Sequence, residues 1–313
     1  FKKGPRHFDS DVIFNDTVTT TTLSETDYDV YRLSDQQNTL PEKLNTLPSV
    51  LIVEDDEDLR LFIRSILEND YEVYEAADGK EGYEKAVELI PDFIVSDIMM
   101  PEADGMELLG NIRKNIRTSH ISFLLLTAKT TLDSKLEGFQ HGADDYITKP
   151  FSVSFFKVRV QNLLNRRSEL QHYYRNRVNI SSGSKLIGAG EDQEIATNSK
   201  DLEFLHSVNS FIEEHLGNKD FVIEDIANEV GMSRSVFFKK LKGLTGLSPI
   251  EYVRDISLQH AAEIIEKGDF TVKEVAFMVG INDSKYFSRC FKKKYKMTPS
   301  EYKKEIKKSI VEL

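Results

Sequence analysis

Acidic, hydroxyl and amino side chains stand at the ends of four short apolar runs in this sequence. Glu54 and Asp55 follow the first run, and Asp97 follows the second. Thr127 and Lys149 come after the third and fourth runs. The runs are Val50–Val53, Phe93–Ser96, Phe123–Leu126 and Tyr146–Ile147. If they are parallel strands, their carboxyl ends open into one crevice and these side chains become neighbours. Two acids, a hydroxyl and a lysine are what magnesium-assisted phosphorylation of an aspartate requires.

The predicted cofactor is Mg²⁺, which prefers hard oxygen ligands in octahedral geometry and keeps several waters. Asp55 and Asp97 are expected to supply carboxylate ligands, and Glu54 to bind through water. The backbone carbonyl of Met99, two residues past Asp97, is a further predicted ligand.

The predicted catalytic residues are Asp97, Lys149 and Thr127. Asp97 is the nucleophile and phosphoacceptor, Lys149 neutralises charge as a point cation, and Thr127 donates a hydrogen bond to the phosphoryl group. Taken alone, the acidic run Glu54–Asp58 is more typical of a solvated loop that caps a helix. The combination of four matched strand ends favours the phosphorylation site.

The elements that position these residues alternate between strands and amphipathic helices. From Ser49 onward, the apolar runs are separated by segments whose apolar residues recur at i, i+3 and i+4. These segments are Leu59–Leu67, Tyr83–Ile90, Leu132–Phe139 and Phe156–Leu164. Repeated strand–helix units predict an α/β domain with a five-stranded parallel sheet covered by helices on both faces.

Residues 49 to about 168 resemble a response-regulator receiver domain, which has a flavodoxin-like fold. The segments VLIVEDDEDLR, FIVSDIMMPEADGMELL, LLLTAK and GADDYITKPF carry the resemblance. It implies that Glu54 and Asp55 form the acidic pair and that Asp97 accepts the phosphoryl group. It also implies a switch in which Thr127 moves and Tyr146 swings inward on phosphorylation. The same letters at Tyr146 also fit a half-buried aromatic on an edge strand.

Composition limits the class of protein. The chain has 313 residues, 40% of them hydrophobic, which allows two or three domains with sizeable cores. No apolar stretch reaches the length of a membrane span, no signal-peptide pattern opens the chain, and the single cysteine fits a reducing compartment. The net charge is −11, but the part from Ser199 onward has 19 basic and 18 acidic residues. We expect a cytoplasmic chain without direct membrane contact. It is acidic before Ser199 and nearly neutral from Ser199 onward.

The rest of the chain is predicted to be all-helical and contains an internal repeat. Phe221–Gly231 matches Phe270–Gly280, and Ser248–Tyr252 matches Thr298–Tyr302. Each copy has the pattern of a helix, a glycine-containing turn and a second helix, which is typical of a helix-turn-helix unit. The segment Ile250–Glu266 between the copies has one long helical pattern that would fix their spacing.

The second helix of each unit carries a polar face opposite its apolar face. Phe237, Leu241 and Leu244 are predicted to pack inward in the first unit, as are Phe287 and Phe291 in the second. The predicted DNA-contacting residues are Ser235, Phe238, Lys239, Lys242, Lys285, Ser288, Arg289 and Lys292.

A helix of this kind can enter the major groove of double-stranded DNA. Lys239 and Arg289 are the predicted base readers, because long cationic side chains reach the acceptors of guanine. Lys242 and Lys292 are predicted to contact phosphates, which gives affinity without sequence information. Two alternatives stay open: a lysine-rich helix face can simply be solvated, and Phe238 can lie over the edge of the core.

Residues 201 to about 304 resemble the AraC/XylS-type DNA-binding domain. The segment GINDSKYFSRCFKKKYKMTPSEY is similar to that family's signature. The resemblance implies two subdomains, joined by a helix, that occupy successive major-groove segments on one face of DNA. The chain departs from the pattern at Ile281, where an aromatic is common, and at Ser257, where an arginine is frequent.

The opening segment FKKGPRHF resembles the final strand of a histidine-kinase ATP-binding domain. The predicted order is this kinase segment at 1–8, a linker at 9–47, the receiver domain at 48–170, a linker helix and loop at 171–199, the DNA-binding domain at 200–306 and a tail at 307–313. In this order the parts resemble the cytoplasmic end of hybrid two-component regulators, whose parent proteins are anchored in the inner membrane.

These patterns predict a phosphorylation-gated, sequence-specific DNA-binding transcription regulator of a two-component system. No enzyme activity is expected of this segment beyond receiver self-phosphorylation and dephosphorylation. The predicted partners are promoter DNA, a histidine-kinase domain of the same or a partner chain, and a second copy of the phosphorylated chain. The alternative is a phosphorelay or phosphate-sink receiver whose helical tail binds protein partners.

Overall fold

The computed structural model describes residues 47–128, 142–178, 198–218 and 221–311. The predicted kinase-like segment 1–8, almost all of the linker 9–47 and the helical pattern Leu132–Phe139 lie outside the described residues.

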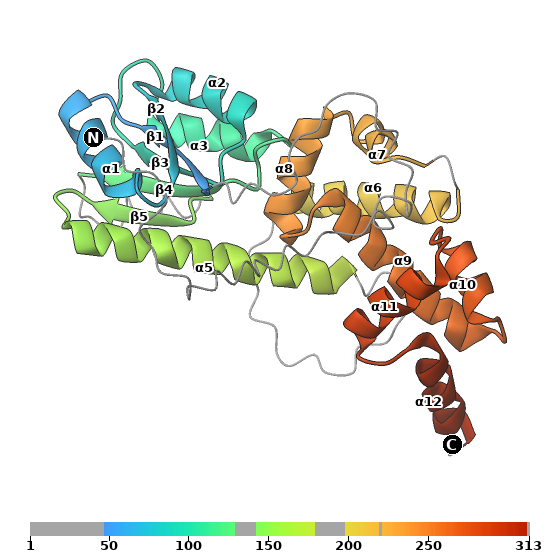
Figure 1. Cartoon of the computed structure of the whole chain (residues 1–313). Helices are drawn as coiled ribbons and strands as arrows, with labels where there is room; N and C mark the ends of the chain where they lie inside the picture. The colour runs from blue at the N-terminus through green and yellow to red at the C-terminus, as the bar shows by residue number, and fades with distance from the viewer. Residues whose placement is uncertain (1–46, 129–141, 179–197, 219–220, 312–313) are drawn as a thin grey trace, which may run out of the picture.

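Five parallel strands form one sheet in the order β2-β1-β3-β4-β5 (Figure 1). The strands are β1 (Ser49–Val53), β2 (Glu72–Ala76), β3 (Phe93–Asp97), β4 (Ser122–Thr127) and β5 (Asp145–Thr148). The strand order reverses at β1, which pairs with β2 on one side and with β3 on the other. In such sheets the crevice for ligands opens outside the carboxyl ends of the strands at this reversal. The predicted five-stranded parallel sheet is confirmed.

Helices cover both faces of the sheet because successive strand residues point to opposite sides. Ile52 and Val95 pack against α1 and α5, whereas Leu51 and Ile94 pack against α2 and α3. The helices are α1 (Glu57–Leu67), α2 (Gly79–Leu89), α3 (Gly105–Lys114) and α5 (Val153–Val178).

The second domain is built from helices around two apolar cores. Its helices are α6 (Ser199–His215), α7 (Ile223–Glu229), α8 (Arg234–Thr245), α9 (Pro249–Lys267), α10 (Val272–Met278), α11 (Ser284–Tyr295) and α12 (Pro299–Val311). The long helix α9 contributes Tyr252 and Ile256 to the first core, and Leu258 and Ala261 to the second. The predicted pair of units with a connecting helix is therefore confirmed.

The turn of each unit is made possible by a glycine. Gly231 and Gly280 have φ angles of 65° and 78°, a left-handed conformation that side chains with a Cβ rarely adopt. The turns direct α8 and α11 so that Phe237 and Phe287 are fully buried in their respective cores. The inward-facing residues predicted for both helices are confirmed.

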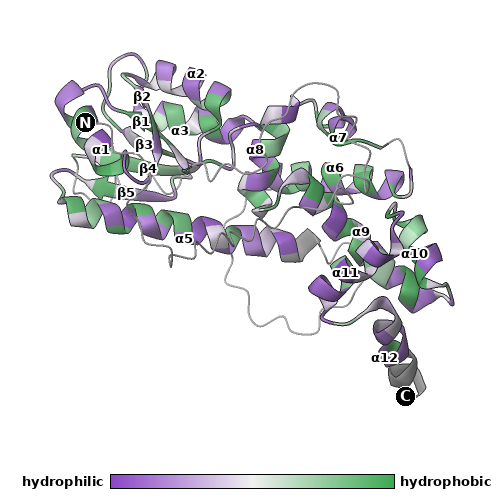
Figure 2. Cartoon of the chain, viewed as in Figure 1, coloured by the Kyte–Doolittle hydropathy of each residue, from purple (hydrophilic) through white to green (hydrophobic). Residues whose placement is uncertain are grey.

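One helix belongs to both domains. α5 has 26 residues and passes without a break across residue 170, the predicted domain boundary. Phe156 and Val160 near its start lie in the sheet core, whereas Leu170 and Tyr174 pack in the core of the first helical unit. Hydrophobic and hydrophilic bands alternate along it (Figure 2). Among the residues placed by the structure, no helix meets the length and apolarity needed to span a membrane.

Candidate functional site

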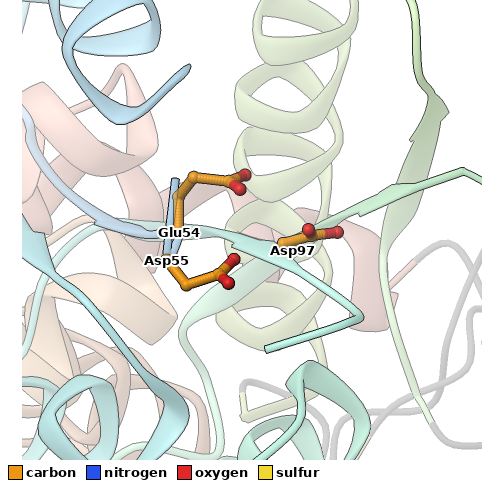
Figure 3. A group of neighbouring side chains, drawn as sticks. All are labelled: Glu54, Asp55 and Asp97. Atoms are coloured by element: carbon orange, nitrogen blue, oxygen red, sulfur yellow. The ribbon is translucent and has the colours of Figure 1, made fainter. Parts of the chain in front are cut away.

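Three carboxylates meet at the carboxyl end of the sheet. Glu54 follows β1 and is buried, Asp97 ends β3 and is buried, and Asp55 is exposed beside them. One ligand oxygen from each lies within 4.8 Å of the other two (Figure 3). The sheet therefore brings together the three acids that the sequence placed at separate strand ends.

Lys149 joins this group from the end of β5. Its amino nitrogen lies 2.8 Å from Oδ2 of Asp97 and 2.9 Å from Oε2 of Glu54. Its backbone N–H donates to the carbonyl of Thr127 at 2.7 Å, which ties the ends of β4 and β5 together. One ammonium group thus faces two carboxylates in a partly buried site.

The environment of Lys149 keeps it charged. Burial alone would lower its pKa, but the hydrogen bonds to Asp97 and Glu54 outweigh burial and raise the pKa above its usual value. Burial raises the pKa of the Glu54 carboxyl, and the contact with Lys149 opposes that shift. A cation is therefore held next to Asp97 across the neutral pH range.

The residues of the acidic run have two different roles, one in the carboxylate site and one at the start of α1. Oδ1 of Asp56 accepts a hydrogen bond from the backbone N–H of Leu59 at 2.9 Å and caps α1. Nη1 of Arg60 donates to the carbonyl of Glu54 at 2.6 Å and fixes the loop. This arrangement supports Glu54 and Asp55 as the acidic pair, and it gives the capping role of the alternative interpretation to Asp56.

Sequence reasoning missed Gly105, which lets the chain pass close to Asp97. A Cβ at this position would lie 2.0 Å from the carbonyl oxygen of Asp97. The Gly105 N–H donates to the carbonyl of Ile98 at 2.9 Å, and the N–H of Ile98 donates to Oδ1 of Asp97 at 2.7 Å. The signal was available, because Asp104 and Gly105 open a helix after a proline-containing loop, and Asp104 caps that helix.

The remaining predicted residues lie around the same crevice. Thr127 is buried at the end of β4, one strand away from Asp97. Tyr146 on the edge strand β5 is partly buried against the apolar cluster beneath α2 and α3. Met99, two residues past Asp97, is 66% exposed. The movement of Thr127 and Tyr146 and the role of the Met99 carbonyl stay predictions.

The residues present fit a hard divalent cation. The donors that the structure brings together are carboxylate oxygens, which suit Mg²⁺. The site lies at the carboxyl ends of the strands, and Asp55 is exposed there, so waters can complete the coordination. Asp55 and Asp97 would hold the ion directly.

The predicted DNA-reading faces are largely exposed. On α11, Lys285, Arg289 and Lys292 are exposed, and Ser288 is partly buried. The guanidinium of Arg289 lies 5.2 Å from the centre of the Tyr286 ring. This face has the cationic character that DNA contact requires.

On α8 the reading face is exposed at Ser235, Lys239 and Lys242, whereas Phe238 is partly buried. The ammonium group of Lys239 donates a hydrogen bond to the carbonyl of Leu89 in the α/β domain. The two reading helices therefore differ in surroundings, although the sequence repeat predicts equivalent roles for them.

Two family models match the chain. A response regulator receiver domain matches residues 50–161, and a helix-turn-helix domain matches residues 226–305. The two matches cover the α/β domain and most of the helical domain, respectively.

Curated relatives match different shares of this chain. Histidine kinase P4 of Formosa agariphila is 35% identical over 87% of this chain and 20% of that protein, so the chain spans about a fifth of its length. Transcriptional regulatory protein CiaR of Streptococcus pneumoniae is 34% identical over 50% of this chain and 69% of that protein. Among solved structures, chemotaxis response regulator CheY4 of Vibrio cholerae is 33% identical over 38% of this chain and 99% of that chain, with a TM-score of 0.37. The chain belongs to the response-regulator family of two-component systems and joins a receiver domain to an AraC-type helix-turn-helix domain.

Proposed function

We propose that the chain is a transcription regulator whose sequence-specific DNA binding is gated by phosphorylation of Asp97. The observation that carries this proposal is the contact of Lys149 with both Asp97 and Glu54, in a chain that also carries two helix-turn-helix units. A lysine so placed can neutralise a phosphoryl group on Asp97.

The chemistry follows from the positions of these side chains. A carboxylate oxygen of Asp97 attacks the phosphorus of a phosphohistidine, the phosphorus–nitrogen bond breaks, and the electron pair of that bond leaves with the imidazole. Lys149 neutralises charge on the phosphoryl oxygens, and the Thr127 hydroxyl donates a hydrogen bond to one of them. Mg²⁺, when bound by Asp55, Asp97, the Met99 carbonyl and, through water, Glu54, supplies further charge neutralisation.

The proposed phosphoryl donor is a histidine-kinase domain of the same polypeptide or of a partner. Similarity to Histidine kinase P4 over 87% of this chain supports a hybrid arrangement in which kinase, receiver and DNA-binding domain share one protein. A second copy of the phosphorylated chain and a promoter site with repeated elements complete the proposed set of partners.

The DNA-reading assignment is tested by substitutions on α11. Arg289→Ala is expected to weaken binding to the preferred DNA site by about 10-fold or more and to relax base preference, since a lost bidentate contact costs about 1–3 kcal/mol. Lys292→Ala is expected to weaken binding to all sequences alike and to lower the slope of log affinity against log salt by about 1. Fluorescence anisotropy at several salt concentrations, on a site obtained by selection from random DNA, measures both effects.

Lys267→Ala is the matched control, because this lysine at the end of α9 is 75% exposed and lies outside both reading faces. It should leave affinity and salt slope unchanged. Lys239→Ala should weaken binding in the presence of beryllofluoride, a stable mimic of the phosphoryl group. If neither Arg289→Ala nor Lys239→Ala alters DNA affinity, the helical domain does not read DNA. The alternative, a phosphorelay receiver whose helical tail binds protein partners, is then favoured.

A further inference from the structure

The first helix-turn-helix unit packs against the receiver domain through α8, its predicted reading helix. Val236 joins the apolar cluster formed by the sheet with α2 and α3. Lys239, one of the predicted base readers, donates to the carbonyl of Leu89 at the end of α2. Because residues three and four apart share a helix face, the face of α8 that meets the receiver adjoins its predicted DNA-reading face and includes Lys239.

The centre of this contact is a buried group of charges. The Lys240 side chain on α8 is fully buried, and its amino nitrogen lies 2.6 Å from Oδ1 of Asp201 on α6. The receiver contributes Ser119, whose hydroxyl accepts a hydrogen bond from Lys240 at 3.1 Å and donates one to Asp201 at 2.6 Å. The helical domain supplies both charges, and the receiver supplies the polar group that covers them.

A close approach beside this group shows how tightly α8 is docked. A Cβ on Gly243 would lie 2.5 Å from Cδ2 of His120 in the receiver and 3.2 Å from Nη2 of Arg167 on α5. The pKa of His120 lies well below its usual range because of desolvation and of the nearby cations Lys240, Arg167 and Arg113. The imidazole is therefore neutral where a positive charge would meet three others.

The second unit is arranged differently. Lys285, Arg289 and Lys292 on α11 are exposed. The ion pair of its neighbour Lys294 is made with Asp255 of α9, within the helical domain. Within the part of the chain that the structure describes, the reading face of α11 is therefore exposed to solvent, whereas the one on α8 adjoins a whole domain.

DNA does not leave room for that domain. The major groove is about 12 Å wide, which is close to the diameter of a helix with its side chains. The groove walls must lie on both sides of an inserted helix, but the loop carrying Ser119 and His120 already lies against one side of α8. In this arrangement α11 can enter a groove and α8 cannot.

We propose that the contact of Ser119 and His120 with α8 is a latch that withholds the first DNA reader while leaving the second one available. This proposal rests on the proposed DNA-binding function and says how DNA binding is regulated. Phosphorylation then lengthens the DNA segment bound, from one groove to two, rather than switching binding on from zero.

The composition of the latch makes it releasable. Burial of the Lys240–Asp201 pair costs desolvation energy, and separation of the receiver withdraws only the Ser119 hydroxyl, so the pair itself stays intact. The receiver side of the latch lies just before the amino ends of β3 and β4. Asp97 and Thr127 stand at the other ends of these two strands, so a change at the phosphorylation site acts on the elements that carry the latch.

Wedging the latch open is the direct test. Gly243→Met in the full chain places a side chain where His120 stands, and it favours the helical state of α8 because glycine is a poor helix former. Gly110→Met on α3 is the matched control, since a Cβ there meets nothing within 4 Å. Hydroxyl-radical footprinting on a site selected with the beryllofluoride-treated chain is the measurement.

Without beryllofluoride, the parent chain and Gly110→Met should protect only the half of the site that loses protection in Arg289→Ala. Gly243→Met should protect both halves with or without beryllofluoride, also when combined with Asp97→Asn. The latch is refuted if Gly243→Met keeps the parent footprint, or if the untreated parent chain already protects both halves.

A second variant approaches the latch from the receiver side and covers the case of a misfolded Gly243→Met. His120→Lys adds a permanent charge beside Lys240, Arg167 and Arg113, and it should also produce the long footprint. If Arg289→Ala changes no footprint in any background, the proposed DNA-binding function fails. If Arg289→Ala loses protection of its half of the site but Gly243→Met and His120→Lys both keep the short footprint, only the latch fails.

Discussion

Asp97→Asn is expected to abolish uptake of a phosphoryl group from acetyl phosphate and Mg²⁺, because the amide lacks the nucleophilic carboxylate oxygen. The substitution keeps the shape of the side chain and the oxygen that accepts from the N–H of Ile98. Phosphate-affinity electrophoresis of the intact chain should show no shifted band at any time point. Removal of Mg²⁺ with a chelator should have the same effect on the parent chain.

Asp56→Asn is the control for this experiment. Asp56 stands two residues after Glu54, but its side chain caps α1. Asparagine caps helices about as well as aspartate, so phosphorylation and stability should be retained. A shifted band in Asp97→Asn, or its loss in Asp56→Asn, would contradict the assignment of the phosphoacceptor.

Asp201→Leu is expected to destabilise the helical domain by about 3–5 kcal/mol, because it leaves the fully buried Lys240 without its carboxylate. Burial already lowers the pKa of Lys240, and Asp201 opposes that shift. The double variant Asp201→Leu with Lys240→Met should recover most of the loss, since two apolar groups replace two buried charges. Chemical unfolding is followed by far-ultraviolet circular dichroism, because the chain has no tryptophan.

An exposed ion pair provides the comparison. Lys267 and Glu263 on α9 lie 3.4 Å apart, with Lys267 mostly in solvent. Removing Lys267 should change the free energy of unfolding by less than about 1 kcal/mol. If Asp201→Leu has an equally small effect, Lys240 is not held by Asp201 in solution.

The sequence predicted which side chains come together in the receiver domain, because these side chains stand at strand ends. Glu54, Asp97 and Lys149 each follow an apolar run, and parallel pairing alone brings such positions to one edge. The repeat predicted the two helical units equally well, because Phe237 and Phe287 mark the same inward face in both copies.

What the sequence could not predict depends on contacts between distant segments. Lys240 follows the predicted reader Lys239, and nothing local distinguishes a buried lysine from an exposed one. The partners of its ammonium group, Asp201 and Ser119, lie 39 and 121 residues away in the sequence. The close approach of Gly105 to Asp97 likewise depends on the path of a loop.

The continuous helix α5 makes the chain a lever. Val160 is embedded beside the sheet and Tyr174 in the core of the first helical unit, so about 21 Å of helix separates the two anchor points. A tilt of about 5° at the Val160 end moves the Tyr174 end by about 2 Å over that length. The amino nitrogen of Lys240 lies 3.1 Å from the hydroxyl oxygen of Ser119. A displacement of about 2 Å is enough to break this hydrogen bond. A rotation small enough to leave the receiver fold intact can therefore be amplified, at the far end of the lever, into separation of the two domains.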